Sequence, residues 1–583
     1  MKSMKEVLEK KIEEALYALQ AAGTLPVFDV PPVRVERPKD EQFGEYTTNT
    51  ALVLAKLAGR NPMELAEAIS QQLAKNLSVG QEGDQPEDIF EKIEVARPGY
   101  LNFYFSSRYF LDIVSDINRK GTGIDHIGAD EKEKVMVEYS QPNTHKEFHI
   151  GHLRNVFIGS TLVNVLRARG HEVIAANYIG DTGTHIAKCL WGLMMFHADE
   201  DLDAIEDKVE FLGRVYSEAT QKIADNPEYE DAFKSLQKKF EEGDTVLVAL
   251  WEKTKRWSMD EFERIYRQLD VVFDVYFYES VEEAAGKKLL PELLEKGIVE
   301  QSDGAIIANL EQCGLGVLVL VRTDGSALYG LKDIPLAKKK FEHYGIGKSI
   351  VVVDIRQSLY FRQLFKILEL YGFHKEMIHC GYEFVALKGG ESMSSRKGNV
   401  IPARLLIDRV SEQVKMQFPE SPDSEAIALG AIRFTMLRHS AASRIEFDIK
   451  ESIRLDGATG PYVQYAHARI ASILRKAEEN GFAAEERHAT MRTMLHAKEI
   501  ELIRELSKFP ELVGDVAVTY EVHKLAHYAI RVAERFHSFY NECKVIDEER
   551  RDVSMARLEL VRAVQIVLAE MLGLMGIAAP GKM

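Results

Sequence analysis

The strongest constraint on the fold of this chain lies in residues 133–180. An apolar run of strand length, KVMVEYS, is followed by a polar loop and then by a helical pattern over about 151–169 that ends at Gly170. A second apolar run, HEVIAANYI, follows at once. Strand, helix and strand in this order form a βαβ unit, which requires a parallel sheet because the crossover returns the chain in the same direction.

The same pattern recurs later in the chain. A strand with its core at Ile350 to Val353 leads into the helical stretch RQSLYFRQLFKILELYG. Between the two units lie an acidic helical insertion at about 199–300 and a hairpin formed by AIIANL and GVLVLVRTDG. We therefore predict an α/β protein in which residues 126–405 form a doubly wound, Rossmann-type domain that binds a nucleotide.

Two further regions flank this domain. Residues 1–125 predict an α+β unit, with an amphipathic helix over 1–22, two more helices, and two strands around the Pro-Gly turn of ARPGYLNFYF. From about residue 405 onward strand signals nearly vanish, which predicts a connecting helical segment at 406–460 and an all-α domain at 461–583.

Composition limits the possible partners. The net charge of −17 counts against a nucleic-acid ligand, but the acidity is concentrated in residues 199–300, so a locally basic face elsewhere remains compatible with RNA. The four cysteines form no CxxC pair, which argues against a disulfide framework and against a cysteine-based zinc site. The N-terminus has no apolar signal-type core and no stretch suits a membrane span. We expect a cytoplasmic monomer with no membrane partner and no structural metal.

The stretch QPNTHKEFHIGHLRN carries three histidines, His145, His149 and His152. A metal site would need all three together, but the residues around Pro142 predict a loop, so His145 need not share a helical face with the other two. Two polar residues at the start of a helix are the ordinary alternative.

The position of this helix favours an anion site instead. A helix N-terminus that follows a parallel strand presents free N–H groups and the positive end of the helix dipole. The imidazoles of His149 and His152 would donate to phosphate oxygens there, Gly151 allows close approach of the backbone, and Lys146 adds a positive charge. This combination is typical of a site that stabilises charge in phosphoryl or nucleotidyl transfer.

The motifs around this site resemble those of a known family. HIGH is the signature of class I aminoacyl-tRNA synthetases, and the longer string resembles the arginyl-tRNA synthetase version, S-P-N-x-A-K-E-M-H-V-G-H-L-R-S. NYIGDTGTHI resembles the N-x-x-G-D-W-G-x-Q of the same enzymes. DEQFGEYTTNTAL and ARPGYLNFYF resemble their N-terminal domain, which touches the outer corner of the tRNA, and DGATGPYVQYAHARIASILRKA resembles their helical anticodon-binding domain.

The resemblance implies a class I ligase that activates L-arginine with ATP and Mg²⁺ and transfers it to tRNA(Arg), with adenylate formation dependent on bound tRNA. An arginine pocket needs a carboxylate that pairs with the guanidinium. In DGSALYGLKDIPLA, Tyr329 and Asp333 lie one helical turn apart and match the family residues that hold the arginine side chain. By the same resemblance Asn143 holds the α-amino group and Gln357 lies near the substrate.

The second class I motif, Lys-Met-Ser-Lys-Ser, is altered here to SMSSRKGN. Serines occupy both lysine positions, and by resemblance Lys146 takes over the role of the second lysine. The expected catalytic residues are His149, His152, Lys146, Ser394, Arg396 and Lys397. The expected ATP-binding residues are His149, Gly151, His152, Met393 and Ser394.

Three alternatives remain open at this point. A different class I synthetase, such as a cysteinyl enzyme, would want a cysteine-rich zinc pocket. A non-catalytic tRNA-binding paralogue is compatible with the serines of the second motif. A small adenylyltransferase with an HxGH motif would not need the helical C-terminal domain.

The aromatic residues Tyr528, Phe536, Phe539 and Tyr540 have the chemistry to stack anticodon bases, but their helical spacing predicts that most of them belong to the core.

Overall fold

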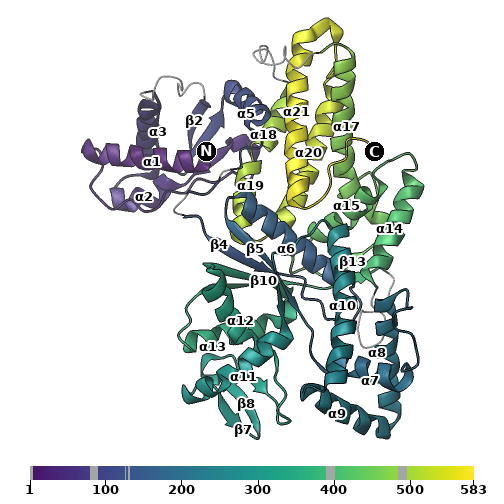
Figure 1. Cartoon of the computed structure of the whole chain (residues 1–583). Coiled ribbons are helices and arrows are strands. Elements are labelled where there is room, and N and C mark those ends of the chain that lie inside the picture. The colour runs from purple at the N-terminus through teal and green to yellow at the C-terminus, as the bar shows by residue number, and fades with distance from the viewer. Residues whose placement is uncertain (1–3, 79–88, 125, 129–130, 389–400, 483–495) are drawn as a thin grey trace.

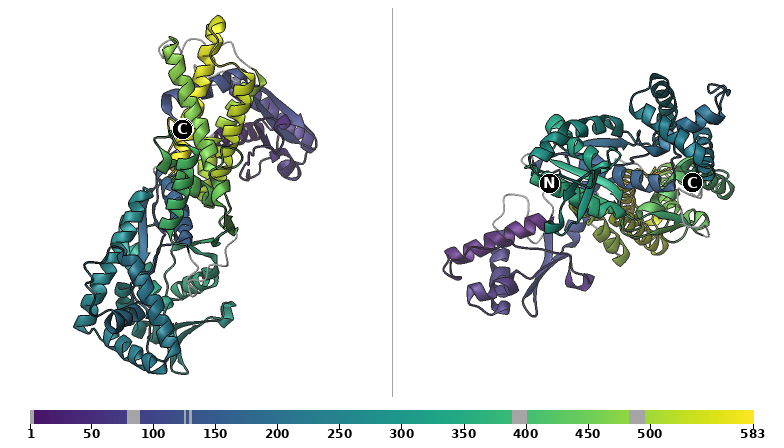
Figure 2. Two further views of the ribbon diagram at one scale, coloured as in Figure 1. Left: turned by 90° about the vertical axis from the view of Figure 1, so that its right-hand side faces the viewer. Right: turned by 90° about the horizontal axis from the view of Figure 1, so that it is seen from below.

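The computed structural model describes residues 4–78, 89–124, 126–128, 131–388, 401–482 and 496–583. The molecule is elongated, with an α/β region below, a helical C-terminal region above it, and the N-terminal unit beside the upper helices (Figures 1 and 2).

The N-terminal unit is a small antiparallel sheet covered by helices. Its strand order is β1-β3-β2, and Leu8, Ile12, Ala15, Leu16 and Leu19 of the first helix face its core, which confirms the predicted amphipathic stripe. Helix α5, which the sequence patterns did not predict, ends the unit and is N-capped by Ser106. The elements are α1 (Met4–Ala21), β1 (Tyr46–Thr48), α2 (Thr50–Ala58), α3 (Pro62–Ser78), β2 (Phe90–Ala96), β3 (Tyr100–Phe105) and α5 (Ser107–Lys120).

The central sheet has five parallel strands in the order β11-β10-β4-β5-β6, which confirms the doubly wound topology. Alternate side chains of β4 point to opposite faces: Val135 and Val137 pack with helix α6, and Met136 packs with helix α12. The elements are β4 (Lys134–Glu138), α6 (Ile150–Ala168), β5 (Glu172–Ile179), α7 (Thr184–Phe196), β6 (Val275–Tyr278), α11 (Glu279–Glu295), α12 (Tyr329–Tyr344), β10 (Lys348–Asp354), α13 (Ser358–Leu370) and β11 (Glu376–Tyr382). A three-stranded antiparallel sheet contains the predicted hairpin, with β7 (Glu300–Ser302), β8 (Ala305–Asn309) and β9 (Val317–Val321).

The acidic segment at 199–300 is not a helical insertion throughout. Helices α8 (Lys208–Asp225), α9 (Pro227–Glu241) and α10 (Thr245–Gln268) form the inserted part, but β6 pairs in parallel with β5 and is the edge strand of the central sheet. The strand was missed because it is only four residues long, too short for a clear periodic pattern, and its place is set by pairing with a strand about a hundred residues earlier.

In its described residues, the C-terminal region is helical apart from one short strand, β13 (Ile445–Phe447), which pairs in parallel with β12 (Val385–Leu387). The guanidinium of Arg433 is buried where this region meets α6, and it donates to the carbonyl oxygen of Gly576 and to Ser160. The helices are α14 (Ala403–Gln417), α15 (Ser424–Leu437), α16 (Ile449–Ser452), α17 (Gly460–Glu479), α18 (Ala497–Leu506), α19 (Phe509–Thr519), α20 (His523–Glu542) and α21 (Arg551–Leu574).

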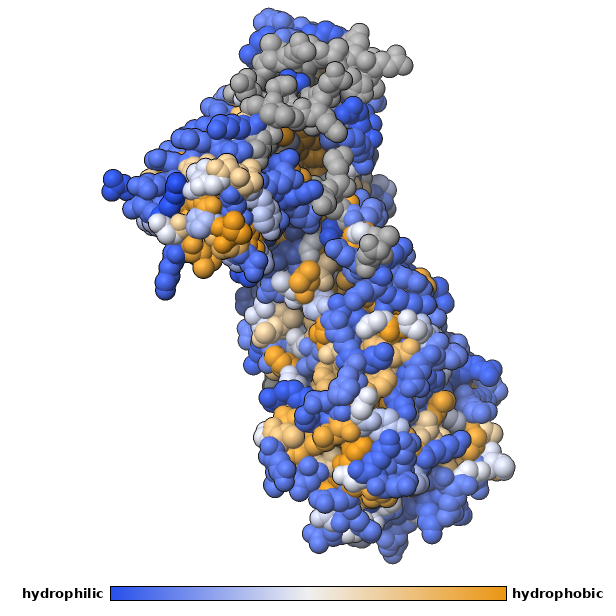
Figure 3. All heavy atoms as spheres, turned by 90° about the vertical axis from the view of Figure 1, so that its left-hand side faces the viewer, coloured by the Kyte–Doolittle hydropathy of each residue, from blue (hydrophilic) through white to orange (hydrophobic). Residues whose placement is uncertain are grey.

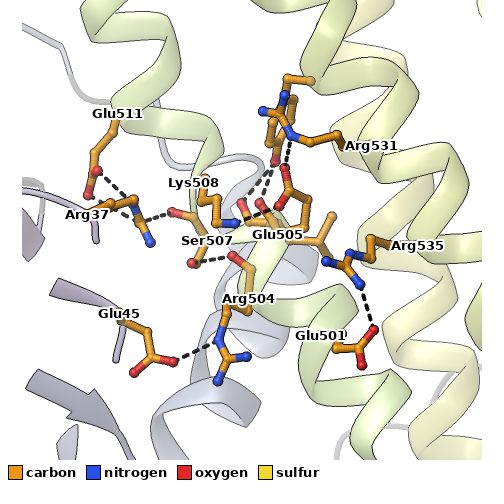
Figure 4. Close-up of polar contacts among 12 residues, drawn as sticks. Arg37, Glu45, Glu501, Arg504, Glu505, Ser507, Lys508, Glu511, Arg531 and Arg535 are labelled. Atoms are coloured by element: carbon orange, nitrogen blue, oxygen red, sulfur yellow. Dashed lines mark hydrogen bonds and ion pairs between the residues drawn. The ribbon is translucent and has the colours of Figure 1, made fainter. Parts of the chain in front are cut away.

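Ion pairs join the N-terminal unit to the C-terminal helices (Figure 4). Arg37 pairs with Glu511 of α19 at 3.0 Å, and Arg504 of α18 pairs with Glu45 at 2.8 Å. The side chain of Glu45 is only 2% exposed, so loss of its partner would leave a buried charge unpaired. These pairs hold the N-terminal unit in a defined place against the helices.

The surface seen in Figure 3 is largely hydrophilic, with smaller hydrophobic areas on the N-terminal unit and on the α/β region. None of the helices in the described part of the chain combines the length and the apolar character that crossing a membrane requires.

Candidate active site

The loop between β4 and α6 has an unusual backbone. Ser140, Gln141 and His145 adopt positive φ angles of 79°, 44° and 62°, a region that side chains other than glycine rarely occupy. Hydrogen bonds hold the loop in this shape: the amide of Ser140 donates to Asn155 at 2.6 Å, and the amide of His145 donates to Ser258 of α10 at 2.9 Å. Strained backbone that its surroundings enforce in this way is typical of functional sites.

His145 is a structural residue of this loop. Its side chain is fully buried, with Nε2 2.8 Å from the hydroxyl of Thr254 and Nδ1 3.1 Å from that of Thr144. Burial, with smaller contributions from nearby cationic groups, lowers the pKa of His145 to about 3. The residue therefore ties the loop to α10 as a neutral imidazole, and it is not grouped with His149 and His152.

This burial predicts an acid-sensitive contribution to stability. The pKa of His145 is 6.5 in its ordinary state and about 3 in the folded protein, so its contribution is intact above pH 6.5 and is lost as the pH falls toward 3. At pH 5 the loss amounts to about 2 kcal/mol. In His145→Gln, the decrease in unfolding free energy between pH 7 and pH 5 should be smaller by about that amount.

The unfolding free energies are measured by urea titration monitored by tryptophan fluorescence. This signal reports on the region around His145, because the three tryptophans of the chain are Trp191, Trp251 and Trp257, on α7 and α10. The same pH dependence in His145→Gln as in the parent chain would contradict the assignment.

His149 and His152 form a reciprocal cap at the N-terminus of α6. His149 is the N-cap and its Nδ1 accepts from the amide of Gly151 at 3.1 Å, while Nδ1 of His152 accepts from the amide of His149 at 3.1 Å. The two rings stack with their centroids 3.7 Å apart. Because each Nδ1 is an acceptor, each neutral ring carries its proton on Nε2 and offers that N–H as a donor.

Burial keeps both of these imidazoles neutral. It lowers the pKa of His149 to about 4 and the pKa of His152 well below its ordinary value, and in each case the positive charge of Lys146 acts in the same direction. Neutral donors at a helix N-terminus suit a polyanion, because they stabilise it without a competing proton equilibrium near pH 7.

Lys146 is the cation at the centre of this group. Its side chain is half-buried, burial lowers its pKa, and no carboxylate lies within ion-pairing distance in the part of the chain that the structure describes. Its charge also lowers the pKa of His185, near the start of α7. The sequence patterns did not identify His185, although it stands where the family string has glutamine. A half-buried cation without a counterion fits an anionic ligand.

Asn143 lies beside the carboxyl end of β5. It forms a parallel bridge with Gly180, and a side chain at Gly180 would place its Cβ 2.3 Å from Oδ1 of Asn143. Gly180 therefore leaves space for the Asn143 amide at the sheet edge. Gln357 is exposed after the end of β10, at the same edge. The carboxyl edge of such a sheet is where ligands bind.

The predicted arginine-binding pair lies at the start of α12. Tyr329 is its first residue and is 60% exposed, so it lies at the rim of the site. Oδ2 of Asp333 accepts from the hydroxyl of Tyr360, whereas the buried Oδ1 has no partner in the described chain. Burial, opposed by this hydrogen bond and reinforced by the charge of Glu138, raises the pKa of Asp333 to about 7. A buried carboxylate oxygen left free in this way fits a cationic group with N–H donors.

A second carboxylate accompanies Asp333, and the sequence patterns did not identify it. Glu138 ends β4, and both carboxylates line a cavity of about 30 Å³ between the sheet and helices α12 and α13. Glu138 pairs with Lys340 at 2.6 Å and accepts from Gln141 at 3.2 Å. The available signal was a single charged residue inside the apolar run KVMVEYS.

The residues predicted in the second motif, Met393, Ser394, Arg396 and Lys397, lie outside the described residues. Residues 401–403 are hydrogen-bonded to the backbone on either side of His149. The amide of Ile150 donates to the carbonyl oxygen of Ile401 at 3.2 Å, and the amide of Ala403 donates to the carbonyl oxygen of Phe148 at 2.8 Å. Residues 401–403 therefore lie against the N-terminus of α6.

The described residues contain no group of three or more histidine, cysteine or acidic side chains with the geometry of a metal site.

Three family models match consecutive parts of the chain. They are described as arginyl tRNA synthetase N terminal domain over residues 4–105, tRNA synthetases class I (R), catalytic domain over 114–448, and DALR anticodon binding domain over 463–583. The catalytic model alone covers more than half of the chain.

Individual relatives agree along nearly the whole length. The arginine–tRNA ligase of Bdellovibrio bacteriovorus is 34% identical over 550 residues, covering 91% of this chain and 91% of that protein, and the arginine–tRNA ligase of Clostridium perfringens is 34% identical over 560 residues, covering 94% and 96%. The arginyl-tRNA synthetase structure from Thermus thermophilus superposes with a TM-score of 0.78 at 28% identity and covers 99% of this chain and all of that one. Taken with the histidine cap and the free carboxylate of Asp333, these matches show that the chain belongs to the arginyl-tRNA synthetase family.

Proposed function

We propose that this protein is an arginine–tRNA ligase, which converts L-arginine and ATP to arginyl-adenylate and pyrophosphate and then transfers the arginyl group to the 3′ end of tRNA(Arg). The single observation that carries the choice of amino acid is the buried Oδ1 of Asp333, which has no hydrogen-bond partner among the described residues. A guanidinium offers N–H donors and a permanent positive charge to such an oxygen.

In the first step, a carboxylate oxygen of arginine attacks the α-phosphorus of ATP in line. The new C–O–P linkage forms as the bond to the pyrophosphate oxygen breaks, and pyrophosphate leaves. Catalysis of this kind consists mostly of positioning and of stabilising charge on the phosphate oxygens. The Nε2–H groups of His149 and His152 donate to those oxygens, Gly151 lets the nucleotide approach the helix, and Lys146 stabilises the pentavalent transition state.

Arginine would lie across the carboxyl ends of β4, β5 and β10. Asp333 and Tyr329 hold its guanidinium, Asn143 holds its α-amino group, and Gln357 lies beside it. Ser394, Arg396, Lys397 and Met393 are assigned to ATP and pyrophosphate by the family resemblance. Mg²⁺ would accompany ATP, whose phosphate oxygens are the ligands that this ion prefers.

The third substrate, tRNA, would contact the C-terminal helices. Tyr528, Phe536 and Phe539 are fully buried and belong to the core. Tyr540 is half-buried, carries the guanidinium of Arg469 4.4 Å from its ring centre, and lines an open hollow of about 850 Å³ at the end of α20. The hollow also carries acidic side chains at 547–549, so we assign it to an unpaired base and not to a phosphate.

Replacing Tyr540 with alanine should raise the KM for tRNA about 10-fold, because a base stacked on an aromatic ring contributes about 1–3 kcal/mol. The KM for arginine, measured at saturating tRNA, should stay the same. Aminoacylation kinetics with varied tRNA measure both values. An unchanged KM for tRNA in a variant with normal thermal stability would show that the hollow does not receive a base.

The proposed function is tested by exchange of labelled pyrophosphate into ATP, with each amino acid in turn and with and without total tRNA. We expect exchange with arginine in the presence of tRNA and none with the other amino acids. A folded sample without arginine-dependent exchange would leave a tRNA-binding protein without catalysis as the better description.

A further inference from the structure

Tyr178, on β5, has a polar group that the proposed mechanism leaves unused. Its side chain is 9% exposed, and its ring packs among Met136, Phe277 and Leu336. The hydroxyl oxygen is buried and has no hydrogen-bond partner within the described ranges. Buried hydroxyl groups are normally paired, so an exception beside a binding site needs an explanation, and a ligand group that donates to it is one.

Strand geometry places Tyr178 on the same face of the sheet as Glu138. Glu138 pairs in register with Ala176, so Tyr178 lies two residues further along the neighbouring strand, toward the carboxyl edge. Side chains two apart share a face of the sheet, and this face is the one that α12 covers. Asp333 precedes Leu336 by one turn of that helix, and Leu336 packs in the same cluster as Tyr178.

The charges around Tyr178 agree with this placement. Burial raises the pKa of Tyr178 well above its ordinary value, and Asp333 is the charged group that raises it most, followed by Glu279 and Glu138. The phenol therefore keeps its proton at neutral pH and retains lone pairs that accept hydrogen bonds.

A guanidinium requires acceptors of this kind. It has five N–H donors and no acceptor, so a pocket that buries it must supply several oxygen atoms. Within the described chain Oδ1 of Asp333 has no partner. Glu138 is less available: its Oε1 accepts from Gln141, and its Oε2, which makes no hydrogen bond there, lies 2.6 Å from the ammonium of Lys340. The hydroxyl of Tyr178 is a further buried oxygen on this face of the sheet that has no hydrogen-bond partner among the described residues.

We propose that the hydroxyl of Tyr178 is a further binding group for the arginine side chain and accepts an N–H of the guanidinium beside Asp333. The proposal rests on the proposed function. An acceptor at this position makes the pocket complementary to a planar group with several donors. Lysine, whose ammonium group is smaller, would leave this hydroxyl unpaired and would be bound less well.

Tyr178→Phe tests the proposal, because it removes only the oxygen. The KM for arginine in pyrophosphate exchange at saturating tRNA should rise about 10-fold or more. The kcat should change less, because the lost hydrogen bond stabilises bound arginine and the transition state equally. Without ligand, the variant should melt at the same temperature as the parent chain or higher, because an unsatisfied buried group has been removed. The rise in melting temperature that saturating arginine produces in the parent chain should become smaller.

Tyr528→Phe is the matched control. Tyr528 is also fully buried, but its hydroxyl donates to the carbonyl oxygen of Glu505 at 2.8 Å. Its loss should lower the melting temperature without ligand and leave the KM for arginine unchanged.

Two results would overturn the proposal: an unchanged KM for arginine in Tyr178→Phe, or a lower melting temperature without ligand combined with an undiminished shift by arginine. Failure of the proposed function is recognised separately, because the parent chain would then show no arginine-dependent exchange.

Discussion

Replacing Asp333 with asparagine is expected to raise the KM for arginine about 100-fold or more, the largest effect on substrate binding that we anticipate from one side chain. The change preserves the shape of the residue but removes its negative charge. Loss of one partner of a buried, hydrogen-bonded charge pair costs about 2–5 kcal/mol, and each 1.4 kcal/mol is tenfold in affinity. Steady-state pyrophosphate exchange with varied arginine measures the effect.

The pH dependence of arginine use gives an independent readout of the same residue. Asp333 has a pKa of about 7 in the free protein, because its carboxyl group is buried. Below this pH the group is neutral and must release a proton before it pairs with the guanidinium, so kcat/KM for arginine should fall about tenfold for each pH unit below 7. Above pH 7 the carboxylate is ionised and the profile should level off. In Asp333→Asn this acid limb should disappear.

Glu342→Gln is the matched control, since Glu342 is exposed on the same helix and its replacement also removes one negative charge. It should leave both the KM for arginine and the pH profile unchanged. If Asp333→Asn retains a normal KM for arginine, Asp333 does not pair with the substrate and the choice of amino acid loses its main structural support.

Replacing Lys146 with methionine is expected to lower kcat for arginine-dependent exchange about 100-fold to 1,000-fold, with little change in the KM for arginine. Removing one group that stabilises charge in the transition state typically has an effect of this size. Lys146 is half-buried, and within the described chain no carboxylate offsets its charge, so that charge is available to a phosphate. Exchange measured at saturating ATP, arginine and tRNA separates kcat from binding.

Lys146→Arg serves as the companion variant. It keeps a positive charge in a different shape and should retain part of the lost activity. A nearly normal kcat in Lys146→Met would instead assign the role to Arg396 or Lys397, which follow the two serines of the altered second motif.

Much of the architecture is visible in local patterns. The stripe of Leu8, Ile12 and Leu16 on α1 depends on residues a few positions apart and occurs as the periodicity predicts. The cap of α3 is equally local, because the side chain of Asn61 accepts from the amide of Met63. The βαβ unit is equally local, and the chirality of its crossover restricts the topology of the sheet. Strand β6 escaped prediction because it is very short. Helix α5 was missed although local signals were present: Ser106 caps it, and Phe110, Val114 and Ile117 repeat at helical spacing.

At the candidate site, too, some features can be predicted from the sequence and others depend on the fold. The three histidines of QPNTHKEFHIGHLRN look alike in the sequence, and the structure separates them. His149 and His152 cap a helix, whereas His145 is buried between two threonines.

The amino-acid sequence, through its periodicity and its HIGH stretch, was sufficient to establish the class of fold and the family, and to predict the helix N-terminus that we propose binds the phosphates. Tertiary packing decided which polar groups have no partner among the described residues, including Oδ1 of Asp333, the hydroxyl of Tyr178 and the charge of Lys146. The reason is physical: a hydrogen-bonding group is free or satisfied only in relation to neighbours from distant parts of the chain, and periodic patterns carry no information about those neighbours.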